Sequence, residues 1–115
     1  ALIDARKGLN MFRKVNVPLL GIIENMSHFL CTECGARHEI FGNGGARAEA
    51  AKLGVPFLGE VPLEMAIRAT SDEGTPIVAS QPDSPHAAHY RAIAEAVLQT
   101  LELSAQKASP KIIVE

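Results

Sequence analysis

Residues 17–23 and 55–62 each open with valine, proline, two apolar residues and glycine, and each continues as a short apolar run. Runs of this length with β-branched residues favour strands that are covered on both faces. Residues 46–53, which lie between them, are rich in strong helix formers and end at Gly54, a typical residue just after a helix. Strands separated by a helix predict a parallel α/β sheet. With two or three strands visible, we expect that sheet to be partial.

Other segments carry helical spacing or helix-start residues. Ser84 and Pro85 form an N-cap followed by proline at the first helical position, which predicts the start of a last helix. His86 and His89 are expected on the solvent side of that helix. The remaining expected elements are helices at 2–14 and 63–71, a brief extended segment at 77–79, a last helix ending near 103 and a flexible tail at 104–115.

Composition excludes several classes of function. No apolar run approaches the roughly 20 residues of a membrane-spanning helix, which predicts no membrane association. The net charge of −2 includes no basic stripe, and the chain has one tyrosine, four phenylalanines and no tryptophan, so nucleic acid is not an expected partner. The chain starts without an initiator methionine or a secretory leader, and we expect a segment of a longer cytoplasmic protein.

Cys31 and Cys34 are the only cysteines, and they lie in a predicted loop excursion at 28–43 that includes a small hairpin. In a reducing compartment a C-x-x-C pair more often binds metal or performs redox chemistry than forms a structural disulfide. Structural zinc and Fe–S clusters usually take four protein ligands, and the pair supplies two. Either His28 and His38 complete a zinc site, or a symmetric dimer brings two pairs together. Thiol redox and incidental loop thiols are the remaining alternatives.

Asn25 follows the first predicted strand, at the carboxyl edge where open α/β sheets bind ligands. Its carboxamide offers a donor and an acceptor that match the edge of adenine, although a turn-forming asparagine is the commoner explanation. The glycine-rich residues 42–45 suit either an anion-binding nest or a flexible helix entry, without the Lys-Ser/Thr of a Walker A loop. Pro62 and Glu64 mark the exit of the second strand.

Six phrases of the sequence occur in the order of a known protein family. They lie at residues 4–12, 24–27, 31–35, 40–46, 53–63 and 74–78. In this order they resemble the C-terminal half of the Mrp/ApbC family, iron–sulfur cluster carrier P-loop ATPases related to MinD and nitrogenase iron protein. The resemblance extends from residue 1 to about 101 and implies a P-loop fold with a deviant Walker A motif.

The resemblance also implies roles for particular residues. Cys31 and Cys34 would bind a [4Fe-4S] cluster shared between the two subunits of a homodimer, with Zn²⁺ as a possible substitute. Asn25 would approach the adenine of the nucleotide. The segment implied to line the same pocket is Val61, Pro62 and Leu63. Glu64 stands where many relatives have aspartate, so its role stays open.

The chain departs from the family by lacking a Walker A loop and the switch segments that hold magnesium. Residues 1–103 are therefore expected to be the C-terminal part of a P-loop ATPase domain whose phosphate-binding elements lie upstream. Phosphoryl transfer depends on those elements, so we expect no ATP hydrolysis by this chain alone. The full-length protein would use ATP and Mg²⁺ to support cluster transfer to apo iron–sulfur proteins. Alternatives are a zinc-stabilised dimerisation module and a MinD/ParA-like positioning ATPase.

Overall fold

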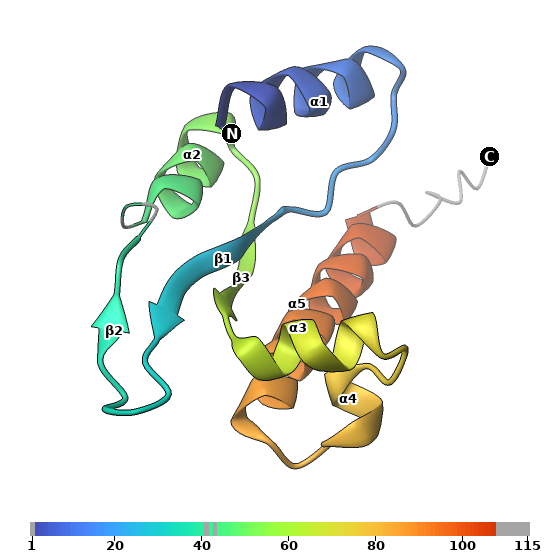
Figure 1. The fold of residues 1–115 in the computed structure, drawn as a ribbon. Helices are drawn as coiled ribbons and strands as arrows, with labels where there is room; N and C mark the ends of the chain where they lie inside the picture. Colours follow the sequence, from blue (N-terminus) through green and yellow to red (C-terminus); the bar gives the residue numbers. More distant parts are fainter. Residues whose placement is uncertain (1, 41, 43, 108–115) are drawn as a thin grey trace, which may run out of the picture.

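The computed structural model describes residues 2–40, 42 and 44–107. Figure 1 shows strands running between helices α1 and α2 on one side and helices α3 to α5 on the other. The elements are α1 (Leu2–Lys14), β1 (Ile22–Leu30), β2 (Arg37–His38), α2 (Gly45–Leu53), β3 (Phe57–Leu63), α3 (Met65–Asp72), α4 (Ile77–Ser80) and α5 (Pro85–Lys107). Among the residues described, no helix combines the length and apolar character needed to cross a bilayer.

The sheet has the strand order β2-β1-β3. β1 and β3 are parallel, and helix α2 lies between them in the chain, which confirms the predicted partial parallel α/β sheet. β2 pairs antiparallel with the end of β1, where Phe29 faces His38 and Leu30 faces Arg37. The predicted small hairpin is therefore present, and it forms one edge of the sheet.

The first strand begins later than predicted. Residues 17–21 connect α1 to the sheet without strand pairing, and β1 starts at Ile22, whose N–H donates to the carbonyl of Pro56 at 2.9 Å. Asn16 adopts a left-handed conformation with φ 58°, and Pro18 has no N–H to donate, so neither favours a ladder here. The consequence is that residues 24–27, expected in a loop, lie inside β1.

A bulge interrupts β1 at these residues. Asn25 pairs with Val61 and Phe29 pairs with Leu63, so β1 uses four steps where β3 uses two. Met26 takes a left-handed conformation with φ 53°, and its N–H is bonded by the side-chain oxygen of Asn25 at 3.0 Å. Because a bulge bends a strand and re-aims its side chains, the part of β1 before Met26 and the part that enters the hairpin point differently.

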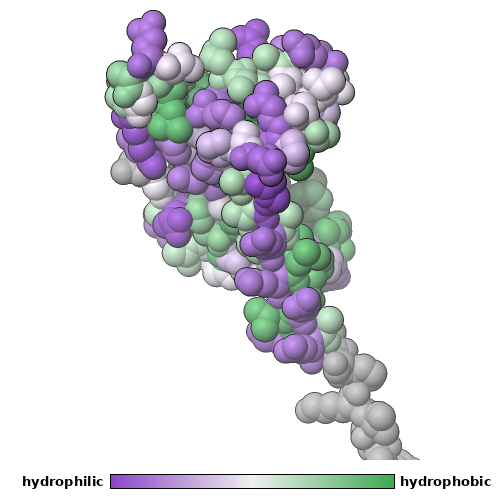
Figure 2. Space-filling view, turned by 90° about the horizontal axis from the view of Figure 1, so that it is seen from below, coloured by the Kyte–Doolittle hydropathy of each residue, from purple (hydrophilic) through white to green (hydrophobic). Residues whose placement is uncertain are grey.

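The helices cover the sheet unevenly. α5 packs on β3, and α2 packs mainly on β1. The buried apolar side chains are Leu9, Ala46, Ala50, Val61, Ile77, Ala87 and Ile93. Figure 2 shows the C-terminal half of α5 extending beyond the rest of the molecule, where Leu98 and Leu103 are each 59% exposed. Part of the apolar surface of this helix is thus open to solvent.

The last helix starts as predicted and ends later. The hydroxyl of Ser84 accepts a hydrogen bond from the N–H of Ala87 at 3.1 Å, which confirms the N-cap. α5 continues to Lys107, four residues past the predicted end at 103, and residues 108–115 of the predicted tail lie outside the described residues.

The segment predicted as extended, 77–79, is instead the short helix α4. The N–H groups of Ala79 and Ser80 both donate to the carbonyl of Pro76 at 2.9 Å. Proline before a helix start leaves its own carbonyl available to close the first turn, and this local bonding replaces a strand that would have no partner here.

Helix α1 is tied to α2 by an ion pair. Arg6 donates through Nε to one oxygen of Glu49, and its Nη2 lies 3.1 Å from the other oxygen. Glu49 is 5% exposed, and the hydrogen bond from Arg6 lowers the pKa of its carboxyl. A groove of about 320 Å³ remains between α1, β1 and α2, so this pair and Leu9 hold α1 in place beside an incompletely filled space.

Candidate functional site

Cys31 and Cys34 lie in the turn that joins β1 to β2, at the lower left of Figure 1. The N–H of Cys31 donates to the carbonyl of Ala36, and the N–H of Gly35 donates to the carbonyl of Cys31, both at 2.9 Å. Gly35 has φ 70°, a conformation that glycine adopts without the steric cost of a Cβ. Both thiols are free, with Cys31 half-buried and Cys34 exposed. The turn therefore presents two sulfurs at one end of the sheet.

The turn also favours the thiolate form of Cys31. Its pKa lies below the ordinary thiol value because the backbone N–H of Cys34, and then that of Glu33, point at the sulfur, with a further contribution from the Cys34 side chain. Thiolates, not thiols, bind metals and act as nucleophiles. The backbone of this loop thus prepares the sulfur for a positively charged ligand.

The two histidines proposed as further ligands lie elsewhere. His38 faces the ring of Phe29, with centroids 6.2 Å apart. His28 is 5% exposed, and its Nδ1 lies 3.0 Å from the hydroxyl of Ser27. No three His, Cys, Asp or Glu side chains lie together as a metal site in the described ranges. The Cys2His2 arrangement is therefore not formed there, and the turn holds the two free thiols alone.

Asn25, the predicted adenine contact, is exposed at the bulge of β1. It faces Val61 across the ladder, so the structure brings together two of the residues implied to border a nucleotide. Val61 is 4% exposed and Pro62 is buried, whereas Leu63 is half-buried. Of the segment 61–63, Leu63 is thus the residue with the most accessible side chain beside this edge.

Glu64 occupies the N-cap position of α3, where its side chain makes no capping hydrogen bond. It is 8% exposed, and its Oε1 lies 3.8 Å from Nδ1 of His86 at the start of α5. The prediction that His86 decorates the solvent side is wrong, because the fold places the starts of α3 and α5 beside each other. No local sequence signal marks this pair.

Sequence reasoning also missed Arg37 and Glu60. Nε of Arg37 donates to Oε1 of Glu39 at 2.6 Å, and its Nη1 lies 3.9 Å from Oε1 of Glu60 on β3. These carboxylates raise the pKa of Arg37, chiefly through the bond to Glu39. The guanidinium of Arg37 therefore links β2, the second strand of the cysteine hairpin, to β3 at the opposite edge of the sheet.

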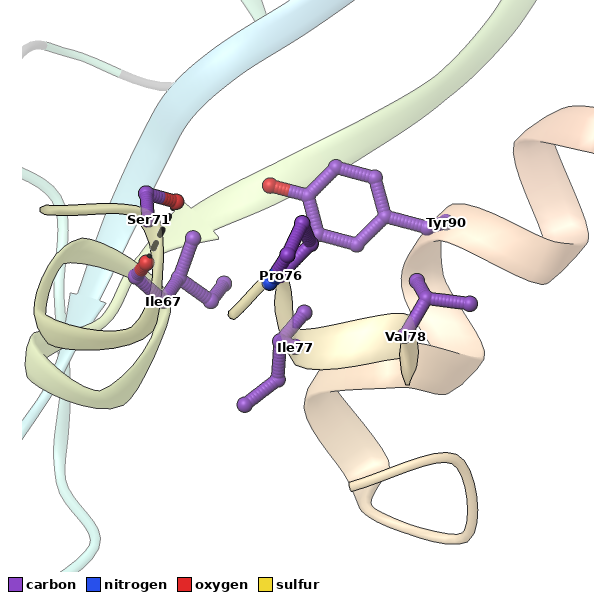
Figure 3. Close-up of a pocket in the computed structure, with 6 residues that line it drawn as sticks. All are labelled: Ile67, Ser71, Pro76, Ile77, Val78 and Tyr90. Carbon is purple, nitrogen blue, oxygen red and sulfur yellow. Dashed lines mark hydrogen bonds between the residues drawn. The ribbon is translucent and has the colours of Figure 1, made fainter. Parts of the chain in front are cut away.

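A pocket of about 210 Å³ lies apart from these residues, among α3, α4 and α5. Figure 3 shows Tyr90 of α5 facing Pro76 and Ile77 across it. Ser71, at its border, already donates its hydroxyl proton to the carbonyl of Ile67 at 2.7 Å. The pocket is mainly apolar, and none of the predicted site residues line it.

The parallel strands β1 and β3, the helices around them and the cysteine turn define an α/β nucleotide-binding fold of the P-loop class that carries a C-x-x-C pair. A solved nucleotide-binding protein from Archaeoglobus fulgidus, in complex with ADP and with cobalt found by PIXE, is similar with a TM-score of 0.55 and 35% identity. The similarity covers 62% of this chain and 29% of that one.

The particular family follows from the sequence match. Residues 1–98 match the family described as "ParA: NUBPL iron-transfer P-loop NTPase", and the chain belongs to this family. The match confirms the expected fold and the suspected kinship with iron–sulfur cluster carriers.

Curated relatives come from distant organisms. The iron–sulfur cluster transfer protein NUBPL of Dictyostelium discoideum is 50% identical over 90% of this chain and 32% of its own length. The iron–sulfur cluster carrier protein of Escherichia coli K12 is 50% identical over 88% of this chain and 27% of its own. An Arabidopsis thaliana protein named as a mitochondrial iron–sulfur protein required for NADH dehydrogenase is also 50% identical, over 89% of this chain and 33% of its own. The chain thus spans about a quarter to a third of the length of these relatives.

Proposed function

We propose that this chain is the cluster-holding part of an iron–sulfur cluster carrier. The observation that carries the proposal is the closed turn at Cys31 and Cys34, whose backbone N–H groups lower the pKa of Cys31. A lowered pKa increases the fraction of Cys31 that is thiolate at neutral pH, and thiolate is the form that binds iron. The exposed position of Cys34 suits a cargo that must be released to another protein.

A dimer supplies the missing ligands in this proposal. A [4Fe-4S] cluster takes four thiolates, and each chain has two. Two copies related by a two-fold axis bring together identical turns, so each turn meets its own counterpart. The turn suits this arrangement because it lies at the tip of a hairpin, where residues 32–36 are exposed.

Nucleotide binding belongs to the same proposal. Asn25 is exposed and pairs with Val61, two residues before the half-buried Leu63 on β3, which supports an adenine contact there. In the full-length protein, ATP and Mg²⁺ would be held by Walker A and switch segments. Hydrolysis would change the dimer geometry and favour transfer of the cluster to apo iron–sulfur proteins in the cytoplasm.

Anaerobic reconstitution with iron and sulfide tests the proposal. We expect the purified protein to gain the visible absorbance of a [4Fe-4S] cluster, half a cluster per chain, and to elute as a dimer. Cys31→Ala and Cys34→Ala should each abolish the absorbance. Thr32→Ala, an exposed change between the same cysteines, is the matched control and should load normally. Full cluster loading in both cysteine variants would overturn the proposal.

Zinc is the second candidate, because two thiolates on such a turn also form half of a tetrahedral zinc site. In that case the chain would be a dimerisation module that transfers no cluster. Metal analysis of protein purified without oxygen separates the two functions: zinc without acid-labile sulfide supports the module, and iron with equal sulfide supports the carrier.

A further inference from the structure

The cysteine hairpin is joined to the sheet by a very short ladder. β2 contains Arg37 and His38, and only these residues pair with β1, through Leu30 and Phe29. An isolated two-stranded hairpin of this length is marginally stable in water. Some contact beyond the ladder is therefore needed to hold the cysteine turn at one angle to the sheet.

Arg37 provides such a contact. In the order β2-β1-β3 the outer strands are separated by β1, yet Nη1 of Arg37 lies 3.9 Å from Oε1 of Glu60 on β3. His28, buried in the central strand, has its Nδ1 4.0 Å from the same oxygen. The carboxylate of Glu60 is thus the point at which a group from each of the other two strands meets β3.

The bulge in β1 explains how Arg37 reaches so far. Glu60 pairs with Glu24, whereas Arg37 pairs with Leu30, six residues further along β1. In a regular strand six residues span about 20 Å, which is beyond the reach of an arginine and a glutamate. The two extra residues between Asn25 and Phe29 shorten this path, so the bend of the strand and the ion pair occur together.

We propose that Arg37 and Glu60 form a clamp that sets the position of the cysteine hairpin on the sheet. Both are positioning residues and touch no ligand themselves. The prediction that the clamp slows cluster release rests on the proposed function. The prediction that it holds the hairpin in position does not.

A double-mutant cycle tests the clamp. Arg37→Gln and Glu60→Gln remove the charges one at a time and together, and both side chains are partly exposed, at 48% and 35%, so the variants should fold. We expect the N–H of Cys31, which donates to Ala36, to exchange about two to five times faster in each single variant, the range for a partly exposed ion pair. Cluster release to a chelator should accelerate by a similar factor. The double variant should be no faster than the faster single one.

Glu39→Gln is the matched control. It removes the negative charge from the 2.6 Å bond that Arg37 makes within its own hairpin segment and leaves the pairing with Glu60, so exchange at Cys31 should stay within twofold of wild type. The clamp would be overturned if exchange rates are unchanged in the single variants, or if the effects of the two substitutions multiply in the double variant. If those variants nevertheless load a cluster normally, the proposed function stands without the clamp. If the single and double variants show the expected rates of amide exchange at Cys31 but the protein never loads a cluster, the clamp is supported and the proposed function is refuted.

Discussion

Gly59 lies in β3 at the point where α5 packs on the sheet, and it has no space for a side chain. Its φ is +148°, and a Cβ at this residue would lie 2.7 Å from Cγ1 of Ile93. Ile93 is 8% exposed, so it cannot swing out to solvent. In Gly59→Ala the new methyl group must therefore displace α5 or distort β3.

The size of the effect follows from two separate costs. Overpacking a filled core costs about 1–3 kcal/mol, and holding a residue other than glycine in this backbone region costs about 1–3 kcal/mol. Their sum of about 2–6 kcal/mol is a large share of the roughly 5–15 kcal/mol by which a typical domain is stable. We expect Gly59→Ala to reduce the free energy of unfolding by this amount.

Urea denaturation followed by far-ultraviolet circular dichroism measures the loss. With a slope of about 1–3 kcal/mol per molar urea, the midpoint should fall by about 1 M or more. Gly74→Ala is the control: it has φ +76° and no atom within 4 Å of a new Cβ, so it bears the backbone cost of about 1–2 kcal/mol alone. Adding Ile93→Ala to Gly59→Ala removes the clashing atom, and the double variant should lose less than the sum of the singles. A Gly59→Ala protein as stable as Gly74→Ala would refute the close packing of α5 on β3.

Two further predictions concern charge and nucleotide recognition. Arg6 lowers the pKa of Glu49, so the pair's stabilisation is fully present above the usual glutamate value of about 4.3 and is lost as pH falls through the lower folded value. Glu49→Gln should therefore lessen the acid-range fall in the free energy of unfolding, measured by urea titrations at several pH values, and an unchanged slope would contradict the ion pair. Asn25→Asp keeps an oxygen for the N–H of Met26 and removes the amide donor, so unfolding should be unchanged while adenine nucleotide affinity falls about tenfold by calorimetry. Equal affinity would exclude the adenine contact.

Local chemistry explains which elements were predictable. Gly54 adopts the left-handed conformation after α2, with φ 68°, and Ser84 caps α5, because both effects act within one turn of the chain. The same holds for the small hairpin that carries the cysteines, whose turn is closed by bonds between Cys31 and residues 35 and 36. The six family phrases predicted the family over residues 1 to about 101, and the family match over residues 1–98 confirms it.

Two of the three errors arose where partners are distant in sequence. The apolar residues 17–21 have the composition of a strand but no ladder, since pairing with β3 begins only at Ile22. Residues 77–79 have β-branched content, yet bonds to Pro76 form a helical turn. His86 meets Glu64 only because α5 returns beside α3. For residues 17–21 and for His86, a neighbour distant in sequence decides the outcome, whereas at 77–79 the deciding bonds are made to the preceding proline.

The sequence by itself determined the class of fold, the family and the pair of sulfurs, because periodicity, capping residues and C-x-x-C spacing are properties of short segments. Only the tertiary structure decided that β1 is bulged at Asn25, that neither His28 nor His38 joins the cysteines, and that a charge on the hairpin meets a carboxylate on β3. The physical reason is that strand register and ion pairs across a sheet depend on distances between strands, which are fixed when the whole sheet packs.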